Sequence, residues 1–365
     1  MRFWDLPGPK GFCEDVEGQL RDNKNLLIAL PNPAPPGFFD ALCEQLDRSG
    51  WNRVSIQASP SVHPGDCLFE QLGIDTTVTE RRSPSVLSRK LEPRLIVVVD
   101  GISKDVWAPW KSFLSEYESV SRGIPSFERA LLVYVVSGIE ESSLPKGAIA
   151  LGISVWQGVL SEIDMLSYAG AKVREKGMEG VYGQLIATTV ARLAQWDVAA
   201  ADMLLDADTN DLFLPQKVLG ELAHYYGWKK GQSLSWDSGV IDNFNGRRQI
   251  HSAFLALDDP TQELSMRVWS SQASSLLPLI ELHRRALIPK IRHRLKLPVQ
   301  IDGEQINDAL DLEIGSLAYM AGQIQIDSSI RAKIRKLRNV RNALAHLEVL
   351  DAKTALDPEL LAFAQ

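Results

Sequence analysis

The sequence predicts an α/β domain with a parallel sheet of about five strands, followed by an all-α helical region and a C-terminal helical bundle. Two observations support this prediction. Short apolar runs alternate with helical patterns through the first 158 residues, and helical spacing dominates from there on. Strands that are apolar along their whole length indicate a sheet covered by helices on both faces, which is typical of parallel sheets.

Four of the expected strands are compact apolar runs, and the second, Arg53-Val54-Ser55-Ile56, is a short one. The first ends at Pro31, and the third, which is the clearest, ends in Asp100-Gly101. Short apolar runs that are rich in β-branched residues and bounded by turn residues are typical of buried strands. The expected strands cover residues 26–30, 53–56, 95–100, 130–136 and 148–155.

Helical spacing fills the intervals between these runs and then the rest of the chain. Apolar side chains recur at intervals that place one face of each helix against a core. The expected helices cover residues 38–47, 105–119, 163–173, 180–205, 212–226, 264–295, 305–323 and 328–350, with interruptions at Pro278 and Pro289.

We expect three domains. Residues 1–158 form the α/β domain, 159–258 a helical lid or winged-helix-like linker domain, and 259–365 the C-terminal bundle. The last boundary follows from Asp258-Asp259-Pro260, because Asp259 can cap a helix that begins at Pro260.

Composition excludes several classes of protein. The 365 residues are 45% hydrophobic and 23% charged, which is typical of a folded chain and not of a disordered one. Three scattered cysteines exclude a disulfide scaffold and a cysteine-based zinc cluster. The net charge of −7 argues against a chain that coats nucleic acid. Without a secretory signal or an apolar run of about 20 residues, we expect a cytoplasmic protein that does not enter the membrane.

The loop after the first expected strand is where a nucleotide-binding domain would hold phosphate. Such a loop needs glycines followed by Lys and Ser/Thr, whereas residues 31–37 contain four prolines, which lack backbone N–H donors. The third strand ends in Asp100 after four aliphatic residues, as the Mg²⁺-holding strand of P-loop ATPases does. Gly101, however, stands where hydrolysing members usually have Glu.

Over about residues 25 to 158 the chain therefore resembles a degenerate AAA+/STAND P-loop ATPase core. The resemblance rests on strand order and spacing. The alternative is a generic doubly wound α/β domain without nucleotide ancestry. On either interpretation we expect no ATP hydrolysis.

Basic residues concentrate near the C-terminus. Residues 270–350 contain twelve Lys and Arg against eight Asp and Glu, although the whole chain is acidic. An anionic partner is favoured in this part of the chain.

The most specific motif lies in residues 338–346, which read RNVRNALAH. Arg341-Asn342, followed after three residues by His346, resembles the Arg-x4-His motif of HEPN domains, and the resemblance covers about residues 260 to 350. It implies a small helical bundle that forms a homodimer in which two motifs share one cleft. Many HEPN proteins are metal-independent ribonucleases of toxin–antitoxin, CRISPR and anti-phage systems.

These residue types suit the cleavage of RNA. A neutral His346 can take the proton of a 2′-hydroxyl, and Arg341 can hold the phosphate oxygens as charge develops. Asn342 can orient a hydroxyl or the imidazole. On a helix Asn342 and His346 share a face opposite the apolar stripe, whereas Arg341 lies closer to that stripe. We expect neither a metal nor a cofactor, and the candidates for RNA binding are Arg338, Arg335, Arg285 and Arg292.

We therefore predict a HEPN-type endoribonuclease of a prokaryotic defence or toxin–antitoxin system, with an inactive ATPase-like module for sensing or scaffolding. The main alternative is a non-enzymatic assembly subunit that dimerises through the bundle and docks onto a partner ATPase or antitoxin protein. A DNA-binding regulator is a third interpretation, which the net acidity disfavours. The arginines and His346 could also be a solvated helix end without catalytic function.

Overall fold

The computed structural model describes residues 2–77, 80–258, 262–301 and 303–362, and these fall into two compact units. The first unit contains the chain up to Asp164 together with residues 195–199 and 231–251. The second contains residues 165–194, 200–230 and the chain from Ser252 onward. Among the helices so described, none combines the length and apolar character that a bilayer crossing requires.

A parallel sheet of five strands forms the centre of the first unit, which confirms the expected α/β core. The strand order is β2-β3-β4-β1-β5, so the fully buried β1 lies between β4 and β5. Ile28 of β1 pairs with Val135 on one side and Ser154 on the other. The strands are β1 (Asn25–Leu30), β2 (Arg53–Gln57), β3 (Ile96–Ile102), β4 (Leu131–Ser137) and β5 (Leu151–Val155).

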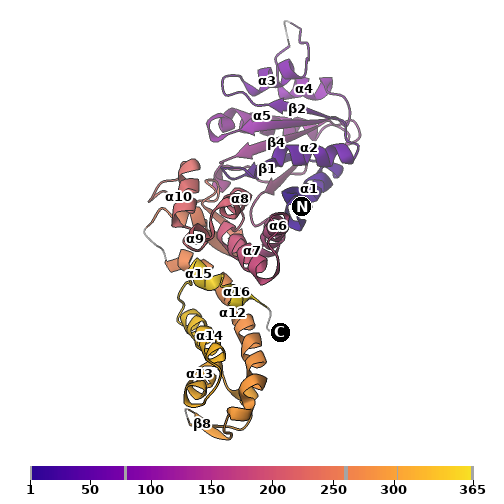
Figure 1. Cartoon of the computed structure of the whole chain (residues 1–365). Helices are drawn as coiled ribbons and strands as arrows, with labels where there is room; N and C mark the ends of the chain where they lie inside the picture. Colours follow the sequence, from indigo (N-terminus) through magenta and orange to yellow (C-terminus); the bar gives the residue numbers. More distant parts are fainter. Residues whose placement is uncertain (1, 78–79, 259–261, 302, 363–365) are drawn as a thin grey trace. The chain divides into compact units, whose positions relative to one another are not determined.

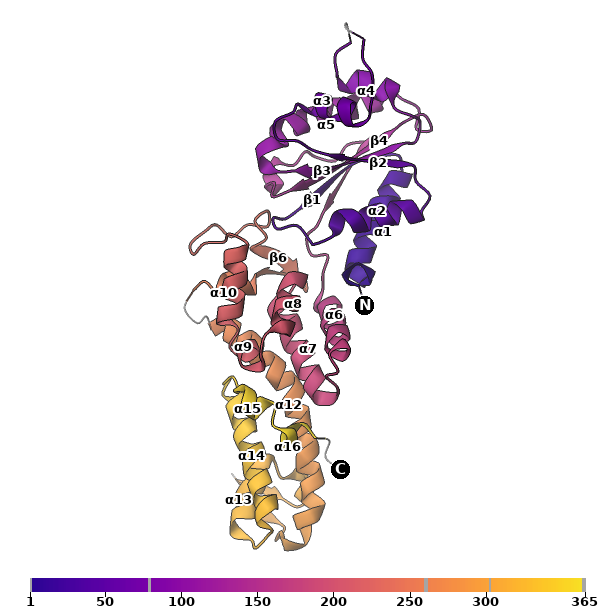
Figure 2. The same cartoon turned by 45° about the horizontal axis from the view of Figure 1, so that its top comes forward.

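Helices cover both faces of this sheet. Figures 1 and 2 show α1 and α2 on one face and α3, α4 and α5 on the other. Their inward side chains complete the core, as with Leu42 and Leu46 of α2 and Trp110 and Tyr117 of α5, which are all fully buried. The helices are α1 (Pro7–Arg21), α2 (Phe38–Arg48), α3 (Pro64–Gln71), α4 (Pro84–Lys90) and α5 (Trp107–Ser121).

The part of the chain after β5 is mainly helical. The long helix α12 packs against α7 and α14, and α14 packs against α13. Figure 2 shows α12 in orange beside the yellow α14. The helices are α6 (Glu162–Glu175), α7 (Gly180–Ala194), α8 (Val198–Asp206), α9 (Thr209–Phe213), α10 (Gln216–Tyr225), α11 (Ser252–Leu255), α12 (Gln262–Ile291), α13 (Ile314–Gln323), α14 (Ser328–Ala345), α15 (Ala352–Ala355) and α16 (Pro358–Leu361).

Two hairpins interrupt the region that the sequence predicts to be all-α. The hairpin of β6 (Ile241–Phe244) and β7 (Arg247–Ile250) turns at Asn245-Gly246, and both turn residues have positive φ. The hairpin of β8 (Val299–Ile301) and β9 (Glu304–Ile306) replaces the first part of the helix expected over 305–323. The expectation of a helix there was therefore wrong before Ile314.

Three other expected helices have different bounds. The helix expected over 180–205 breaks after Ala194, where Gln195 adopts a left-handed conformation with φ 57°. The helix expected over 212–226 is divided in two before Pro215, and the helix expected over 328–350, α14, ends at Ala345. By contrast, α12 continues through Pro278 and Pro289, with buried residues before and after each proline. The expected boundary at Asp258-Asp259-Pro260 lies largely outside the described residues.

Candidate functional site

The residues of the Arg-x4-His motif lie in the last turns of α14. Asp327 caps the start of this helix, since its Oδ1 accepts a hydrogen bond from the backbone N–H of Ser329 at 2.7 Å. A buried stripe then holds the helix against its neighbours, formed by Ile334, Leu337, Val340 and Leu344. The exposed His346 is the C-cap residue, and its backbone N–H donates to the carbonyl of Asn342 at 3.0 Å.

Contacts from α12 anchor the chain on both sides of His346. The indole Nε1 of Trp269 donates to the carbonyl of Leu344 at 2.8 Å. The fully buried Gln272 binds both backbone groups of Leu350, donating to its carbonyl and accepting from its N–H at 2.8 Å each. Sequence reasoning missed Trp269 and Gln272, because nothing local marks a contact across 75 or more positions.

Arg341 is engaged with an acidic side chain from another element. Its Nη2 lies 3.1 Å from Glu313 Oε2, and its side chain is 41% exposed against 75% for Glu313. Its Nη1 lies 3.5 Å from Asn342 Oδ1, which accepts a long hydrogen bond. Arg341 and Asn342 are therefore in contact. The imidazole of His346 makes no hydrogen bond or ion pair with the described residues. The hydrogen bonds of this residue to them come from its backbone.

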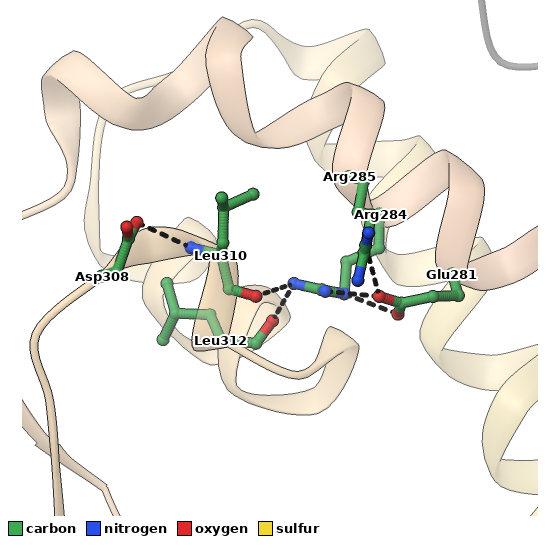
Figure 3. Close-up of polar contacts among 6 residues, drawn as sticks. All are labelled: Glu281, Arg284, Arg285, Asp308, Leu310 and Leu312. Atoms are coloured by element: carbon green, nitrogen blue, oxygen red, sulfur yellow. Dashed lines mark hydrogen bonds and ion pairs between the residues drawn. The ribbon is translucent and has the colours of Figure 1, made fainter.

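A buried arginine holds the segment that carries Glu313 (Figure 3). The guanidinium of Arg284 on α12 donates through Nη1 to the carbonyls of Leu310 and Leu312, at 2.8 and 2.7 Å. Its Nε donates to Glu281 Oε2 at 2.7 Å, and this hydrogen bond is the main reason why the pKa of Glu281 is lowered. Asp308 accepts from the N–H of Leu310 at 3.1 Å. Together these contacts position the residues just before α13.

A cleft of about 300 Å³ lies between α12, the start of α13 and the end of α14. The guanidiniums of Arg284 and Arg341 line it together with three carboxylates. Its charged lining residues are Glu281, Arg284, Asp311, Glu313 and Arg341. The cleft therefore places Arg341 at a polar surface, although carboxylates outnumber arginines there.

The other predicted RNA-binding arginines lie on α12, on the turn after it and on α14, and they have different partners. Arg285 is 67% exposed and lies 3.1 Å from Glu281, while Arg292, which is 64% exposed, lies 3.7 Å from Asp308. On α14, Arg335 is exposed, and Arg338 is half-buried with its Nη2 3.2 Å from Asn339 Oδ1. Arg338 and Arg341 thus share the last turns of one helix, whereas Arg285 and Arg292 belong to the end of α12 and the turn after it.

The carboxyl edge of the sheet, where a P-loop ATPase holds nucleotide, is built differently here. The Asn32–Pro33 peptide bond is cis, and Gly37 is followed by Phe38 and Phe39 where a P-loop carries Lys and Ser/Thr. Trp4 Nε1 donates to the carbonyl of Pro36 at 3.1 Å. The rings of Trp4, Phe12, Phe38 and Trp156 cluster beside this loop, with centroids 4.9–6.0 Å apart.

Asp100 also lies at this edge. Among the described residues, no cationic side chain interacts with its carboxylate. Burial raises its pKa, and the nearby Asp40 adds to the rise. In the same part of the chain, as elsewhere in the described residues, no group of three or more His, Cys, Asp or Glu side chains could hold a metal ion.

Comparisons with known proteins identify no family. No protein-family model and no curated protein match the sequence. Among solved structures, a point mutant of RuvB from Thermotoga maritima matches with 11% identity and a TM-score of 0.36, covering 71% of this chain and 97% of RuvB. Another structure of that RuvB, a Holliday junction branch migration motor, matches with 13% identity and a TM-score of 0.32, covering 68% and 95%.

TM-scores of this size do not identify a fold. What places residues 25–155 in the α/β class is their own parallel sheet of five strands, which fits a core like that of the P-loop ATPases.

Proposed function

We propose that the chain is a metal-independent endoribonuclease of the HEPN type, in which His346, Arg341 and Asn342 act on RNA at the end of α14. The observation that carries the proposal is the arrangement of these residues on one anchored helix end. His346 is exposed, Asn342 is four residues before it, and Arg341 contacts Asn342. The comparisons add no support, so the proposal depends on the residues themselves.

In this mechanism His346 removes the proton of a 2′-hydroxyl, whose oxygen attacks the adjacent phosphorus. The bond to the 5′-oxygen of the next nucleotide breaks, and the protonated His346 gives its proton to that oxygen. A 2′,3′-cyclic phosphate and a 5′-hydroxyl result, and His346 is neutral again. A histidine suits the first step because its ordinary pKa lies near neutral pH. Arg341 stabilises the charge that develops on the phosphate oxygens, and Asn342 orients the imidazole or the hydroxyl.

The ion pair between Arg341 and Glu313 must open before Arg341 can bind phosphate. Both side chains are substantially exposed, and exposed pairs of this kind contribute about 1 kcal/mol or less. A phosphate brought by RNA can therefore replace Glu313. It follows that Glu313 lowers the affinity for RNA in the resting protein, and that its removal should raise it.

We also propose that the active form is a homodimer of the C-terminal bundle. Large apolar side chains are exposed on two of its helices, namely Leu277 and Leu282 on α12 and Tyr319 on α13, at 39%, 51% and 62%. A protein interface that covered these side chains would remove their apolar surface from water. They equally support the second candidate, an assembly subunit that uses the bundle only to dimerise or to dock onto a partner ATPase or antitoxin protein.

The N-terminal unit, in this proposal, is an ATPase-like module without ATPase chemistry. The two phenylalanines after Gly37 and the aromatic cluster support this assignment. The loop therefore has neither the Lys nor the Ser/Thr that P-loop chemistry requires.

The test is incubation of the full chain with labelled RNA in the presence of EDTA. Wild type should cut, and His346→Ala should lose at least about a hundredfold in rate, which is the usual contribution of a general base. The control is His224→Ala, because His224 is an exposed histidine on a different helix. If no RNA is cut by wild type, and the protein is nevertheless a dimer, the assembly-subunit function replaces the ribonuclease.

A second variant tests the part played by Arg341. Glu313→Gln removes the carboxylate that competes with phosphate while keeping similar shape, so it should tighten RNA binding. Arg341→Ala should weaken it. Equal affinity of both variants and wild type would show that this end of α14 does not contact RNA.

A further inference from the structure

A second cleft lies at the amino edge of the parallel sheet. This edge is opposite the carboxyl edge, which carries the aromatic cluster. Its volume is about 480 Å³, within the range of about 300–1,000 Å³ that is common for small-molecule sites. Its lining comes from the turns before β1, β2 and β4 and from Arg94, which precedes β3 by two positions. Because each turn ends at a strand of the same rigid sheet, the lining is held in place.

The charge of this cleft is positive in an acidic protein. Arg21 and Arg94 line it, and none of the lining residues is acidic. Arg21 uses Nε and Nη2 on Glu17, at 2.9 and 2.6 Å, so its Nη1 is not engaged there. The exposed side chain of Arg94 has no hydrogen bond or ion pair with the residues that the structure describes. A guanidinium that is exposed in this way is suited to bind a phosphate.

Two aromatic side chains stand in the same lining. Phe127 is 68% exposed, which is unusual for so large an apolar ring, and Trp51 is half-buried. Exposed aromatic rings next to arginines are the combination that binds nucleotides, because the rings stack on a base while the guanidiniums hold the phosphate.

The backbone around the cleft supports this interpretation. Asn23, Gly50 and Arg94 all adopt left-handed conformations, with φ of 57°, 75° and 63°. For an arginine this conformation is costly, and such residues cluster at functional sites. The N–H of Arg94 donates to the carbonyl of Arg129 at 3.1 Å, which holds it in place.

We propose that this amino-edge cleft binds a nucleoside monophosphate, with the base against Trp51 and Phe127 and the phosphate on Arg21 and Arg94. The site is separate from the proposed ribonuclease centre and does not depend on it. It places a nucleotide at the amino edge of the sheet, whereas a P-loop ATPase uses the carboxyl edge. In this chain the loop of residues 31–37 at the carboxyl edge leaves no phosphate cradle.

The test is calorimetric titration of the full chain with AMP, adenosine and inorganic phosphate in parallel. AMP should bind one site saturably, and adenosine and phosphate should each bind at least about tenfold more weakly, since each lacks one half of the contacts. Arg94→Asn and Phe127→Ser should each weaken AMP binding by about tenfold or more. Asn is chosen at position 94 because it tolerates a left-handed backbone.

The control is Arg48→Asn, because Arg48 is exposed, pairs with Glu44 and does not line the cleft. It should bind AMP as wild type does. Absence of saturable AMP binding, phosphate binding as tight as AMP, or unchanged affinity in both cleft variants with native circular dichroism would each overturn the proposal.

Discussion

Replacing Arg284 by methionine tests how the C-terminal bundle holds the segment before α13. The side chain of Arg284 is only 7% exposed, and it binds the carbonyls of Leu310 and Leu312 as well as Glu281. Methionine fills similar space but donates no hydrogen bond. The carbonyls of Leu310 and Leu312 then lose their charged donor, and Glu281 keeps only Arg285.

The expected cost can be worked out from these contacts. A hydrogen bond to a charged group contributes about 1.5–3 kcal/mol, and Arg284 makes two to backbone carbonyls, one in a buried contact and one in a partly buried contact. Two such hydrogen bonds contribute about 3–6 kcal/mol, and the lower part of this range applies because the contact at Leu310 is only partly buried. We therefore expect the local opening free energy of residues 309–323 to fall by about 3–5 kcal/mol, a loss of at least about a hundredfold in protection against exchange.

Native-state hydrogen exchange of backbone amides measures this directly. It resolves the opening of one segment, whereas a global melt of a chain with two units does not define a single unfolding free energy. Arg285→Met is the matched control, since Arg285 binds the same Glu281 from the adjacent position with a side chain that is 67% exposed. It should change exchange by less than about fivefold. Equal effects of the two substitutions would refute the reasoning from burial.

Three further predictions concern the first unit. Burial raises the pKa of Asp242 to about 7, so the folded state keeps a proton that the unfolded chain loses near pH 4. The urea midpoint of the first unit should therefore fall as the pH rises from about 4 to 7, and Asp242→Asn should reduce the difference between the midpoints measured at pH 5 and 8. The thiols of Cys13, Cys43 and Cys67 are all buried, and burial raises the pKa of Cys13 to about 11. Ellman's reagent at pH 8 should label them rapidly only after urea is added, and rapid labelling of the native protein would contradict this packing. Purified protein should not turn over ATP in a coupled assay, and turnover that Asp100→Ala abolishes would show that the carboxyl edge is active after all.

Most strands could be predicted because they are mainly apolar, and burial on both faces of a parallel sheet leaves that pattern in the sequence. The edge strand β2, which contains Arg53 and Ser55, carries a weaker signal. The break at Gln195 could not be predicted in this way. Helical spacing continues across it, and the left-handed residue is neither Gly nor Asn. The hairpin at Asn245-Gly246 carries a turn signal that sequence reasoning passed over, because the helical patterns on both sides dominated the interpretation.

The residues of the Arg-x4-His motif could be found because they are close in sequence on one helix. Their surroundings could not. Glu313 reaches Arg341 across 28 positions, and Gln272 reaches Leu350 across 78. Such contacts depend on how helices pack, which periodicity does not encode. The pair of Glu281 and Arg285 is local, since four positions on one helix separate them, whereas the contact of Arg292 with Asp308 is not.

The central claim is that His346 activates a 2′-hydroxyl of RNA, and one measurement tests it most directly. An RNA strand and a matched strand with a single 2′-deoxynucleotide at the cleaved position are incubated with wild type in EDTA, and the new ends are identified by mass spectrometry. Our account predicts that the RNA is cut to a 2′,3′-cyclic phosphate, and that the substituted strand and the His346→Ala variant both give no product at that position. Cleavage of the 2′-deoxy position, or wild-type cleavage by His346→Ala, would contradict it.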